Sequence, residues 1–435
     1  MSVTSADPNT GNTDIFTRRE SAVRSYCRSF PVTFTKAKDA RLYTDDGTSY
    51  IDFLAGCSSL NYGHNPDVLQ GALLDYITND GLTHSLDMQT EAKAKFLETF
   101  ESLILKPRGL DYVVQFPGPT GANAVEAAMK AARKATGRQN IIAFTNGFHG
   151  CTLGALAATG NKHHRGGAGI PLQGVTRVPF DGYFGDHVDT ASQLEKMLDD
   201  PSSGIDAPAA ILVETVQGEG GLNAASFKWL RQIQSIARLH GALLIVDDIQ
   251  AGVGRAGKFF SFEDAGIRPD IVTLAKSISG YGLPMALTLL RRDLDLWKPG
   301  EHNGTFRGNC HAFVTATASL EAYWADDNFE QEIARKAAIL AKRFGALSKK
   351  FGNAYATVKG RGMMQGLDVK SGSLASKITS QCFENGLIVE TSGANDEVIK
   401  CLCPLTISDA DFAEGLDILM TAIDEALSDH IKQVA

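Results

Sequence analysis

Between about residues 110 and 290 the chain alternates short apolar, β-branched runs with helical patterns. "DYVVQF" precedes the helical "GANAVEAAMKAARKATGR" and then "NIIAF", while the helical "SFKWLRQIQSIARLHG" separates "PAAILVETV" from "ALLIVDD", before "DIVTLAK" and "MALTLL". This alternation predicts an α/β fold with a mostly parallel sheet and crossover helices. Ligands of such sheets bind at the carboxyl ends of the strands, so the residues that follow each apolar run are the candidates for a functional site.

The pattern differs at both ends of the chain, which has 435 residues and is too long for one simple core. After about residue 325 the amphipathic "FEQEIARKAAILAKRFGALSKKFG" is followed by a strand, a helix, a strand and a final helix. In the first 65 residues "RLYTDDGTSYIDF" resembles a hairpin that turns at Asp46-Gly47. We therefore expect a large domain over residues 66–325 and a smaller α+β domain over residues 326–435, with residues 1–65 packed against the smaller one.

Composition restricts the partners and the compartment. A net charge of -8 provides no field for gathering nucleic acid or an anionic membrane. Seven cysteines, an odd and scattered set, argue against a disulfide framework and fit a reducing cytoplasm. Cys401 and Cys403 have no second pair near metal-ligand spacing, so we interpret them as apolar strand residues. Residues 1–13 lack the apolar core of a signal peptide, and no run of about 18 apolar residues could span a membrane. We expect a cytoplasmic protein.

A lysine ends one of the apolar runs, "DIVTLAK", just before a glycine-rich stretch. Burying an ammonium without a partner is costly, so Lys276 is expected either to pair with a carboxylate or to be committed chemically. The run "ALLIVDD" places Asp247 and Asp248 about one strand-to-strand excursion earlier, and these two neighbours must face opposite ways. Taken alone, Asp247 and Lys276 could form a plain ion pair.

Two further features favour a cofactor. "FPGPTGANAVEAAMK" predicts a strand, a glycine-rich turn and a helix that begins near Gly121, whose free N–H groups form an anion site. "NGFHG" places Phe148 and His149 at another strand end, where a flat ring could stack. Each feature is weak alone, but a phosphate cradle, an aromatic platform, a carboxylate and a lysine together are the parts that hold pyridoxal phosphate as a Schiff base. A lysine so condensed need not carry a free ammonium in the interior, and released in turnover it can act as a general base.

A competing motif is "GVGRAG", residues 252–257, which matches the dinucleotide fingerprint G-x-G-x-x-G and with Lys258 faintly suggests a P-loop. The glycines follow "DDIQ", no helical pattern opens behind them, and Phe259 stands where a P-loop has Ser or Thr. We therefore favour a turn over a nucleotide site.

In nearly its full length the chain resembles the class III, or omega, aminotransferases of pyridoxal phosphate fold type I. The motifs that carry the resemblance are "TGANAVEAAMKAAR", "FHGCTLGALA", "ETVQGEGG", "LLIVDDIQAGVGRAGKFFSFE", "DIVTLAKSISGYGLPMA" and "HNGTFRGN". The resemblance implies a large domain with a mostly parallel sheet and helices on both faces, plus a smaller α+β domain formed by the two chain ends.

The resemblance also implies roles for individual residues. Lys276 would be the Schiff-base lysine, Asp247 the partner of the pyridinium nitrogen, and Phe148 the ring that stacks on the cofactor. The other implied cofactor-binding residues are Thr120, Gly121, Ala122, His149, Gln250 and Thr305. Among these, Gly121 and Ala122 would donate N–H groups to the phosphate, Gln250 would reach the phenolic oxygen, and Thr305 would come from the second subunit of a homodimer or larger homo-oligomer.

The sequence departs from the family pattern at three positions. Ala122 stands where many relatives have Thr or Ser, so backbone donors must hold the phosphate. Arg307 replaces a usual glycine, and no role is assigned to it. Lys400 aligns with the arginine that many relatives use for the α-carboxylate of glutamate; a lysine lacks the bidentate fork, so orientation should be looser or shared. Glu219 is implied as a gate that pairs with a nearby cation when an ω-amine binds and swings aside for glutamate.

Within the family, the chain resembles the subgroup that makes diaminobutyrate and 2-oxoglutarate in ectoine synthesis. The stretches that carry this likeness are "FTRRESAVRSYCRSFP", "SISGYGLPMALTLLRRDLDLWKPGEHNGTFRGN" and "VIKCLCPLTI". This implies transfer of an amino group from L-glutamate to L-aspartate 4-semialdehyde, giving L-2,4-diaminobutyrate and 2-oxoglutarate. The alternatives are another omega-aminotransferase, acting on ornithine, acetylornithine, 4-aminobutyrate or siderophore-pathway diaminobutyrate, and a non-catalytic binding protein that kept the fold.

Overall fold

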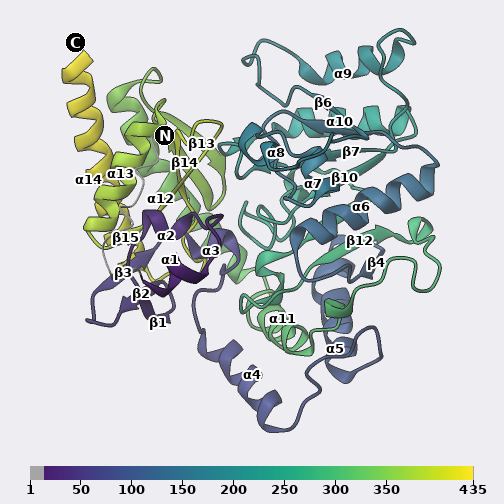
Figure 1. Cartoon of the computed structure of the whole chain (residues 1–435), viewed down its shortest axis with the longest axis horizontal. Coiled ribbons are helices and arrows are strands. Elements are labelled where there is room, and N and C mark those ends of the chain that lie inside the picture. The colour runs from purple at the N-terminus through teal and green to yellow at the C-terminus, as the bar shows by residue number, and fades with distance from the viewer. Residues whose placement is uncertain (1–13, 435) are drawn as a thin grey trace.

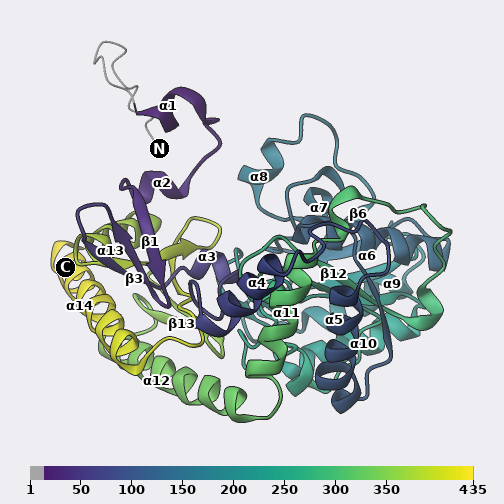
Figure 2. The same cartoon turned by 90° about the horizontal axis from the view of Figure 1, so that it is seen from below.

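The structure is a computed structural model that describes residues 14–434. The prediction about the polar residues 1–13 lies outside this range. Two parts lie side by side in Figures 1 and 2: a large sheet flanked by helices, and a smaller part in which the first strands of the chain lie near its last helices.

The large sheet has seven strands in the order β4-β12-β11-β10-β7-β5-β6. Only β12 runs antiparallel to its neighbours, so the prediction of a mostly parallel sheet is confirmed. The strands are β4 (Tyr112–Gln115), β5 (Ile141–Phe144), β6 (Val175–Val178), β7 (Ala210–Val213), β10 (Leu243–Asp247), β11 (Ile271–Leu274) and β12 (Leu287–Arg291).

Helices cover both faces of this sheet because successive residues of its central strands are mostly apolar, so both faces must be buried. Successive side chains of a strand point to opposite faces, and on β10 this sends Leu244 and Val246 into one cluster and Leu243 and Ile245 into another. The first cluster includes side chains of α10 (Phe227–Leu239), and the second includes those of α6 (Gly121–Thr136) and α7 (Leu153–Ala158). The expected fold class is therefore confirmed.

Further elements complete the large part. The helices α4 (Asp67–Thr78), α5 (Glu91–Phe100) and α11 (Cys310–Tyr323) pack together, with α11 touching the other two. The remaining elements are a π-helical extension of α5 (Glu101–Leu105), α8 (Lys162–Gly166), α9 (Thr190–Asp199), β8 (Val216–Gln217), β9 (Asn223–Ala224), and 3-10 turns η2 (Lys106–Arg108), η3 (Glu263–Ala265), η4 (Lys276–Ser279), η5 (Arg292–Leu294) and η6 (Thr305–Arg307).

The smaller part joins the two ends of the chain. One sheet has the order β1-β2-β3-β15, in which β15 from the C-terminal region pairs with β3, and the other has the order β13-β14-β17-β16. The elements are α1 (Ile15–Arg19), α2 (Tyr26–Ser29), β1 (Phe34–Lys38), β2 (Arg41–Thr44), β3 (Ser49–Asp52), α3 (Ala55–Ser58), α12 (Asn328–Phe351), β13 (Thr357–Arg361), β14 (Met364–Asp368), α13 (Gly372–Glu384), β15 (Leu387–Ile388), β16 (Glu390–Ser392), β17 (Val398–Cys401) and α14 (Asp409–Val434). The boundaries at residues 65 and 325 stay a prediction, which the β3–β15 pairing supports.

Two local predictions are confirmed. The strands β2 and β3 form the expected hairpin, whose turn contains Gly47 at φ +87°, a left-handed conformation that favours glycine. Asp46 stabilises this turn by accepting hydrogen bonds from the Thr44 hydroxyl and the Thr48 N–H. No helix follows "GVGRAG", whose residues form consecutive turns, so the segment lacks the local structure of a nucleotide-binding motif.

Candidate active site

A cavity of about 410 Å³ lies at the carboxyl ends of β10 and β11. Most of the predicted site residues line it, although they come from five separate segments of the chain: Thr120, Gly121, Ala122, Phe148, His149, Glu219, Asp247, Gln250 and Lys276. Thr305 and Lys400 do not line it. The rule that parallel strands present their ligand-binding residues at one edge therefore located the site.

Asp247 stands at the end of β10 with 5% of its surface exposed. Its Oδ2 lies 2.8 Å from His149 Nδ1, and its Oδ1 accepts a hydrogen bond of 3.1 Å from the Thr273 hydroxyl. Burial alone would lower the pKa of His149, but the hydrogen bond and the charge of Asp247 outweigh burial and raise it. The carboxylate is thus held in one orientation, and His149 acts as its support.

Asp248 faces away from Asp247, as the alternation along a strand requires. It is fully buried and accepts hydrogen bonds from both the N–H and the hydroxyl of Ser261. Burial raises the pKa of Asp248 to about 7. Its contacts make it a structural carboxyl group behind the site.

The helix α6 directs its N-terminus into the cavity. Thr120 caps it: its hydroxyl accepts from the Asn123 N–H at 3.3 Å, and its own N–H donates to Asn123 Oδ1 at 3.2 Å. The N–H groups of Gly121 and Ala122 occupy the first two helical positions, where a helix provides no acceptor. Two backbone donors and the positive end of the helix dipole therefore face the cavity.

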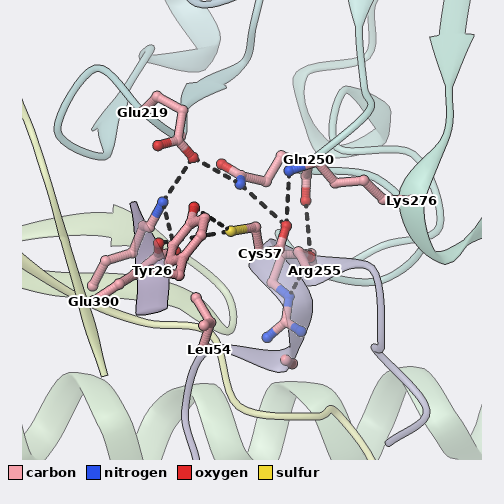
Figure 3. Close-up of polar contacts among 12 residues, drawn as sticks. Tyr26, Leu54, Cys57, Glu219, Gln250, Arg255, Lys276 and Glu390 are labelled. Carbon is pink, nitrogen blue, oxygen red and sulfur yellow. Dashed lines mark hydrogen bonds and ion pairs between the residues drawn. The ribbon is translucent and has the colours of Figure 1, made fainter. Parts of the chain in front are cut away.

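Lys276 is half-buried, and its Nζ donates a 2.8 Å hydrogen bond to the carbonyl oxygen of Cys57. Figure 3 shows Lys276 and Gln250 converging on this oxygen, which also accepts from Gln250 Nε2 at 3.2 Å. The sequence analysis did not identify Cys57. No local pattern points to it, because it acts through its backbone carbonyl and lies more than two hundred residues from Lys276.

The carbonyl of Cys57 belongs to a turn with four successive residues in the left-handed region, Ala55–Ser58, with φ between 44° and 70°. Such a conformation is unfavourable for residues other than glycine, so surrounding contacts must hold it. Asp52 Oδ1 accepts from the Leu54 and Ala55 N–H groups, each at 2.8 Å. The Ser277 hydroxyl, next to the lysine, donates to the Ser58 carbonyl at 2.8 Å.

Arg255 also holds this turn, and it comes from the middle of "GVGRAG". Its guanidinium is fully buried and donates to Asn61 Oδ1 at 2.6 Å, to the Cys403 carbonyl at 2.7 Å and to the Ser58 hydroxyl at 3.0 Å. Burial lowers the pKa of Arg255 to about 10, which leaves it charged at neutral pH. The motif that resembled a phosphate loop is therefore a structural tie between the two chain ends and the large sheet.

Glu219 forms one wall of the cavity and connects it to Lys400 on β17. Glu219 Oε1 lies 2.9 Å from Lys400 Nζ and accepts from Gln250 Nε2 at 3.1 Å, as Figure 3 shows for the glutamine contact. Burial would raise the pKa of Glu219, but the charges of Lys400 and Lys276 lower it to about 2. Lys400 has no exposed surface, so a substrate could reach its ammonium only if Glu219 moved.

Glu214, at the end of β7, is a cavity residue that the sequence analysis missed. It is 8% exposed, and its carboxylate accepts from the Phe148 N–H at 2.9 Å and the Gly218 N–H at 3.3 Å. Burial, together with the charge of Asp247, raises the pKa of Glu214 to about 7 although His149 opposes the shift. Its position directly after "PAAILV" was the available signal.

Thr305 and Arg307 lie in η6, outside the cavity. Thr305 is exposed, and its contact with a phosphate across a subunit interface stays a prediction. Arg307 forms an ion pair with Asp87 and donates to the His302 carbonyl at 3.1 Å, so it ties its loop to the segment before α5. Across residues 14–434, no cluster of His, Cys, Asp or Glu side chains could hold a metal ion, and no helix is long and apolar enough to cross a membrane.

Comparison with known proteins identifies the family. The sequence model of the family "Aminotransferase class-III" matches residues 23–423. The chain belongs to the class III aminotransferases. It is 59% identical over 419 residues to the diaminobutyrate--2-oxoglutarate transaminase of Halomonas elongata, covering 96% of this chain and 100% of that one. It is also 59% identical over 406 residues to the enzyme of that name from Vibrio cholerae, covering 93% and 98%.

Solved structures of aminotransferases share the fold. An ornithine aminotransferase from Toxoplasma gondii superposes with a TM-score of 0.82 at 25% identity, covering 95% of this chain and 94% of that one. An S-selective transaminase from Arthrobacter superposes with a TM-score of 0.83 at 21% identity, covering 95% and 97%. The second likeness concerns the fold alone.

The cofactor of this aminotransferase is pyridoxal 5′-phosphate, and the cavity residues fit it. The free N–H groups at the start of α6 suit a phosphate, and the buried Asp247 carboxylate suits a protonated ring nitrogen. Gln250 Oε1 is buried without a hydrogen-bond partner, as expected of a polar group that meets a bound molecule. Lys276 lines the same cavity, and its amine suits the aldehyde of this cofactor.

Proposed function

We propose that this aminotransferase moves an amino group from L-glutamate to L-aspartate 4-semialdehyde, producing L-2,4-diaminobutyrate and 2-oxoglutarate, as in the first step of ectoine synthesis. One observation carries the proposal: relatives named diaminobutyrate--2-oxoglutarate transaminase match at 54% to 59% identity over at least 93% of this chain. The cavity supports it, because Lys276 and Asp247 have the placement that the chemistry needs.

When bound, the cofactor supplies an aldehyde that takes up the amino group and a ring that withdraws electrons from the reacting carbon. With the cofactor bound, Lys276 would hold it through its amine and would then carry a proton to or from the substrate carbon. The Cys57 carbonyl holds the lysine amine when it is free, since their 2.8 Å hydrogen bond fixes where that amine lies. The lysine is therefore positioned to act as a base at one face of the substrate.

Asp247 would keep the ring nitrogen of the bound cofactor protonated, so that the ring would be an effective electron acceptor. His149 and Thr273 bind both carboxylate oxygens and restrict them to this task. Phe148 provides an apolar ring at the cavity wall that would hold the cofactor by stacking. Gly121 and Ala122 would hold its phosphate with their N–H groups. In a homodimer with shared active sites, Thr305 of the partner subunit adds a hydroxyl.

Glu219 and Lys400 let one cavity accept two kinds of substrate. With an ω-amine in place, Glu219 stays paired with Lys400 at 2.9 Å and the cation is concealed. With glutamate in place, Glu219 moves and Lys400 receives the α-carboxylate. Glycines flank Glu219 on both sides in "QGEGG", which makes that segment able to change conformation at low cost.

The free state of all seven cysteines supports our assignment to a reducing cytoplasm.

The test measures the decay of the absorption band of the lysine-bound cofactor after adding 2,4-diaminobutyrate, ornithine or 4-aminobutyrate singly. Diaminobutyrate should react fastest, because its distal charges meet the partners that the pocket provides. Lys276→Ala is the control and should lose turnover by many orders of magnitude while keeping its fold. Faster reaction with ornithine or 4-aminobutyrate would contradict the substrate, and a protein without the absorption band would contradict catalysis.

A further inference from the structure

Two carboxylates face one lysine beside the active site. Lys400 on β17 is the direct cross-strand partner of Glu390 on β16, and its Nζ lies 3.0 Å from Glu390 Oε1 and 2.9 Å from Glu219 Oε1. The side chains of Lys400 and Glu390 are 0% and 8% exposed, whereas that of Glu219 is 31% exposed. With all three groups ionised, this cluster carries one negative charge in excess.

Glu390 is held by few contacts. Its Oε1 forms an ion pair with Lys400 Nζ at 3.0 Å and has no further hydrogen-bond partner among the described residues. Burial raises the pKa of Glu390, although the charge of Lys400 opposes the shift. A buried carboxylate that shares this lysine with a second carboxylate is costly to keep ionised and calls for an explanation. The second oxygen, Oε2, is contacted only weakly, by the Cys57 Sγ at 3.7 Å.

Glu390 and Lys276 both contact Cys57. Cys57 uses its carbonyl to accept from Lys276 at 2.8 Å and its thiol to approach Glu390 at 3.7 Å. Figure 3 shows Glu390 and Tyr26 on one side of Cys57, with Lys276 on the other. The Tyr26 hydroxyl lies 2.7 Å from the same sulfur. Glu219 lines the cavity that contains Lys276, whereas Lys400 and Glu390 do not, so the charge of the cluster acts on a molecule in the cavity through Glu219.

The two ω-amines that the enzyme must tell apart differ in a single group. Both 2,4-diaminobutyrate and 4-aminobutyrate carry a terminal amine and a carboxylate four carbons away, but only diaminobutyrate has an α-ammonium. We propose that Glu390 is the specificity-determining residue for that α-ammonium, a role that rests on the proposed function. Its charge leaves the Glu219–Lys400 wall negative by one unit, which attracts the α-ammonium of diaminobutyrate. 4-Aminobutyrate has the same carboxylate but no α-ammonium to gain from this attraction.

Glutamate gains nothing from this charge. Its α-amino group would react at Lys276 and its α-carboxylate would bind Lys400, where the negative charge of Glu390 opposes a second carboxylate. Loss of the Glu390 charge should therefore slow the diaminobutyrate half-reaction without slowing the glutamate half-reaction. A residue that only positioned Lys400 would show the opposite pattern, because glutamate alone uses Lys400 directly.

The experiment replaces Glu390 with Gln in the holoenzyme, which removes the charge and keeps the shape. Rates of cofactor-band decay give kcat/KM for diaminobutyrate, 4-aminobutyrate and glutamate separately. The diaminobutyrate to 4-aminobutyrate ratio should fall about tenfold or more, while kcat/KM for glutamate should not fall. Glu397→Gln is the matched control: it removes a carboxylate from the same hairpin without touching Lys400, and all three rates should persist.

Glu390→Asp provides a second variant in case the glutamine protein folds poorly. It keeps the charge but withdraws it by one methylene, so the ratio should lie between those of wild type and Glu390→Gln. An unchanged ratio in these variants, or a larger loss for glutamate than for diaminobutyrate, would overturn the inference. If wild type itself preferred 4-aminobutyrate, the proposed function would fall as well, which distinguishes the two failures.

Discussion

Replacing Arg255 with Met is expected to lower the free energy of unfolding by about 3 kcal/mol. The guanidinium is fully buried and binds neutral partners only: the Ser58 hydroxyl, Asn61 Oδ1 and the carbonyl oxygens of Met363 and Cys403. Each buried acceptor that loses its hydrogen-bond donor costs about 1–3 kcal/mol. Part of this loss is recovered because methionine removes the cost of burying a charge.

The same substitution should also affect the site, because Arg255 helps to hold the left-handed turn Ala55–Ser58. Three of its four residues are not glycine, and each is unfavourable in this conformation by about 1–2 kcal/mol. A turn released from Arg255 is expected to relax and move the Cys57 carbonyl away from Lys276. We therefore expect slower proton transfer as well as lower stability.

Urea denaturation of both proteins at equal saturation with cofactor measures the first effect, since bound cofactor itself adds stability. Arg343→Met is the matched control: it breaks an exposed pair with Asp417, which should cost less than about 1 kcal/mol. If the free energy of unfolding of Arg255→Met were within about 1 kcal/mol of wild type, with an unchanged m-value, the idea that this arginine ties the chain ends to the sheet would be refuted.

Three further predictions concern the carboxylates of the cavity. Asp247→Asn should reduce turnover far more than cofactor retention, and full turnover once the cofactor is resupplied would contradict the role. Asp247 raises the pKa of His149 despite burial, so the pair should stabilise the cofactor-free protein. This contribution to the free energy of unfolding is complete below the unfolded histidine pKa of about 6.5 and is lost as pH rises through the folded pKa. The corresponding fall in stability with pH should be absent in Asp247→Asn. Glu219→Ala should change the glutamate and diaminobutyrate half-reactions unequally, and equal changes measured by single-turnover absorption would argue against a gate.

The alternation of strands and helices was enough to predict the large sheet, and with it the edge where the site lies. Each strand of a parallel sheet ends at the same edge, so Asp247 and Lys276 could be placed together from their positions after "ALLIV" and "DIVTL". The start of α6 was equally readable, because a capping threonine and a glycine precede the helical pattern. These features depend on local periodicity and on one general rule of topology.

Only the tertiary structure showed the partners that hold these residues. Cys57, Arg255 and Glu390 act on the lysine, on the turn beneath it and on Lys400, and they come from three distant segments. Arg255 even belongs to a motif whose spacing suggested a phosphate loop. Local sequence determines which residues can form a strand end or a helix start, since those depend on neighbours in the chain. Which buried charge meets which carbonyl is decided by how the two chain ends close over the sheet, because contacts across such separations leave no period in the sequence.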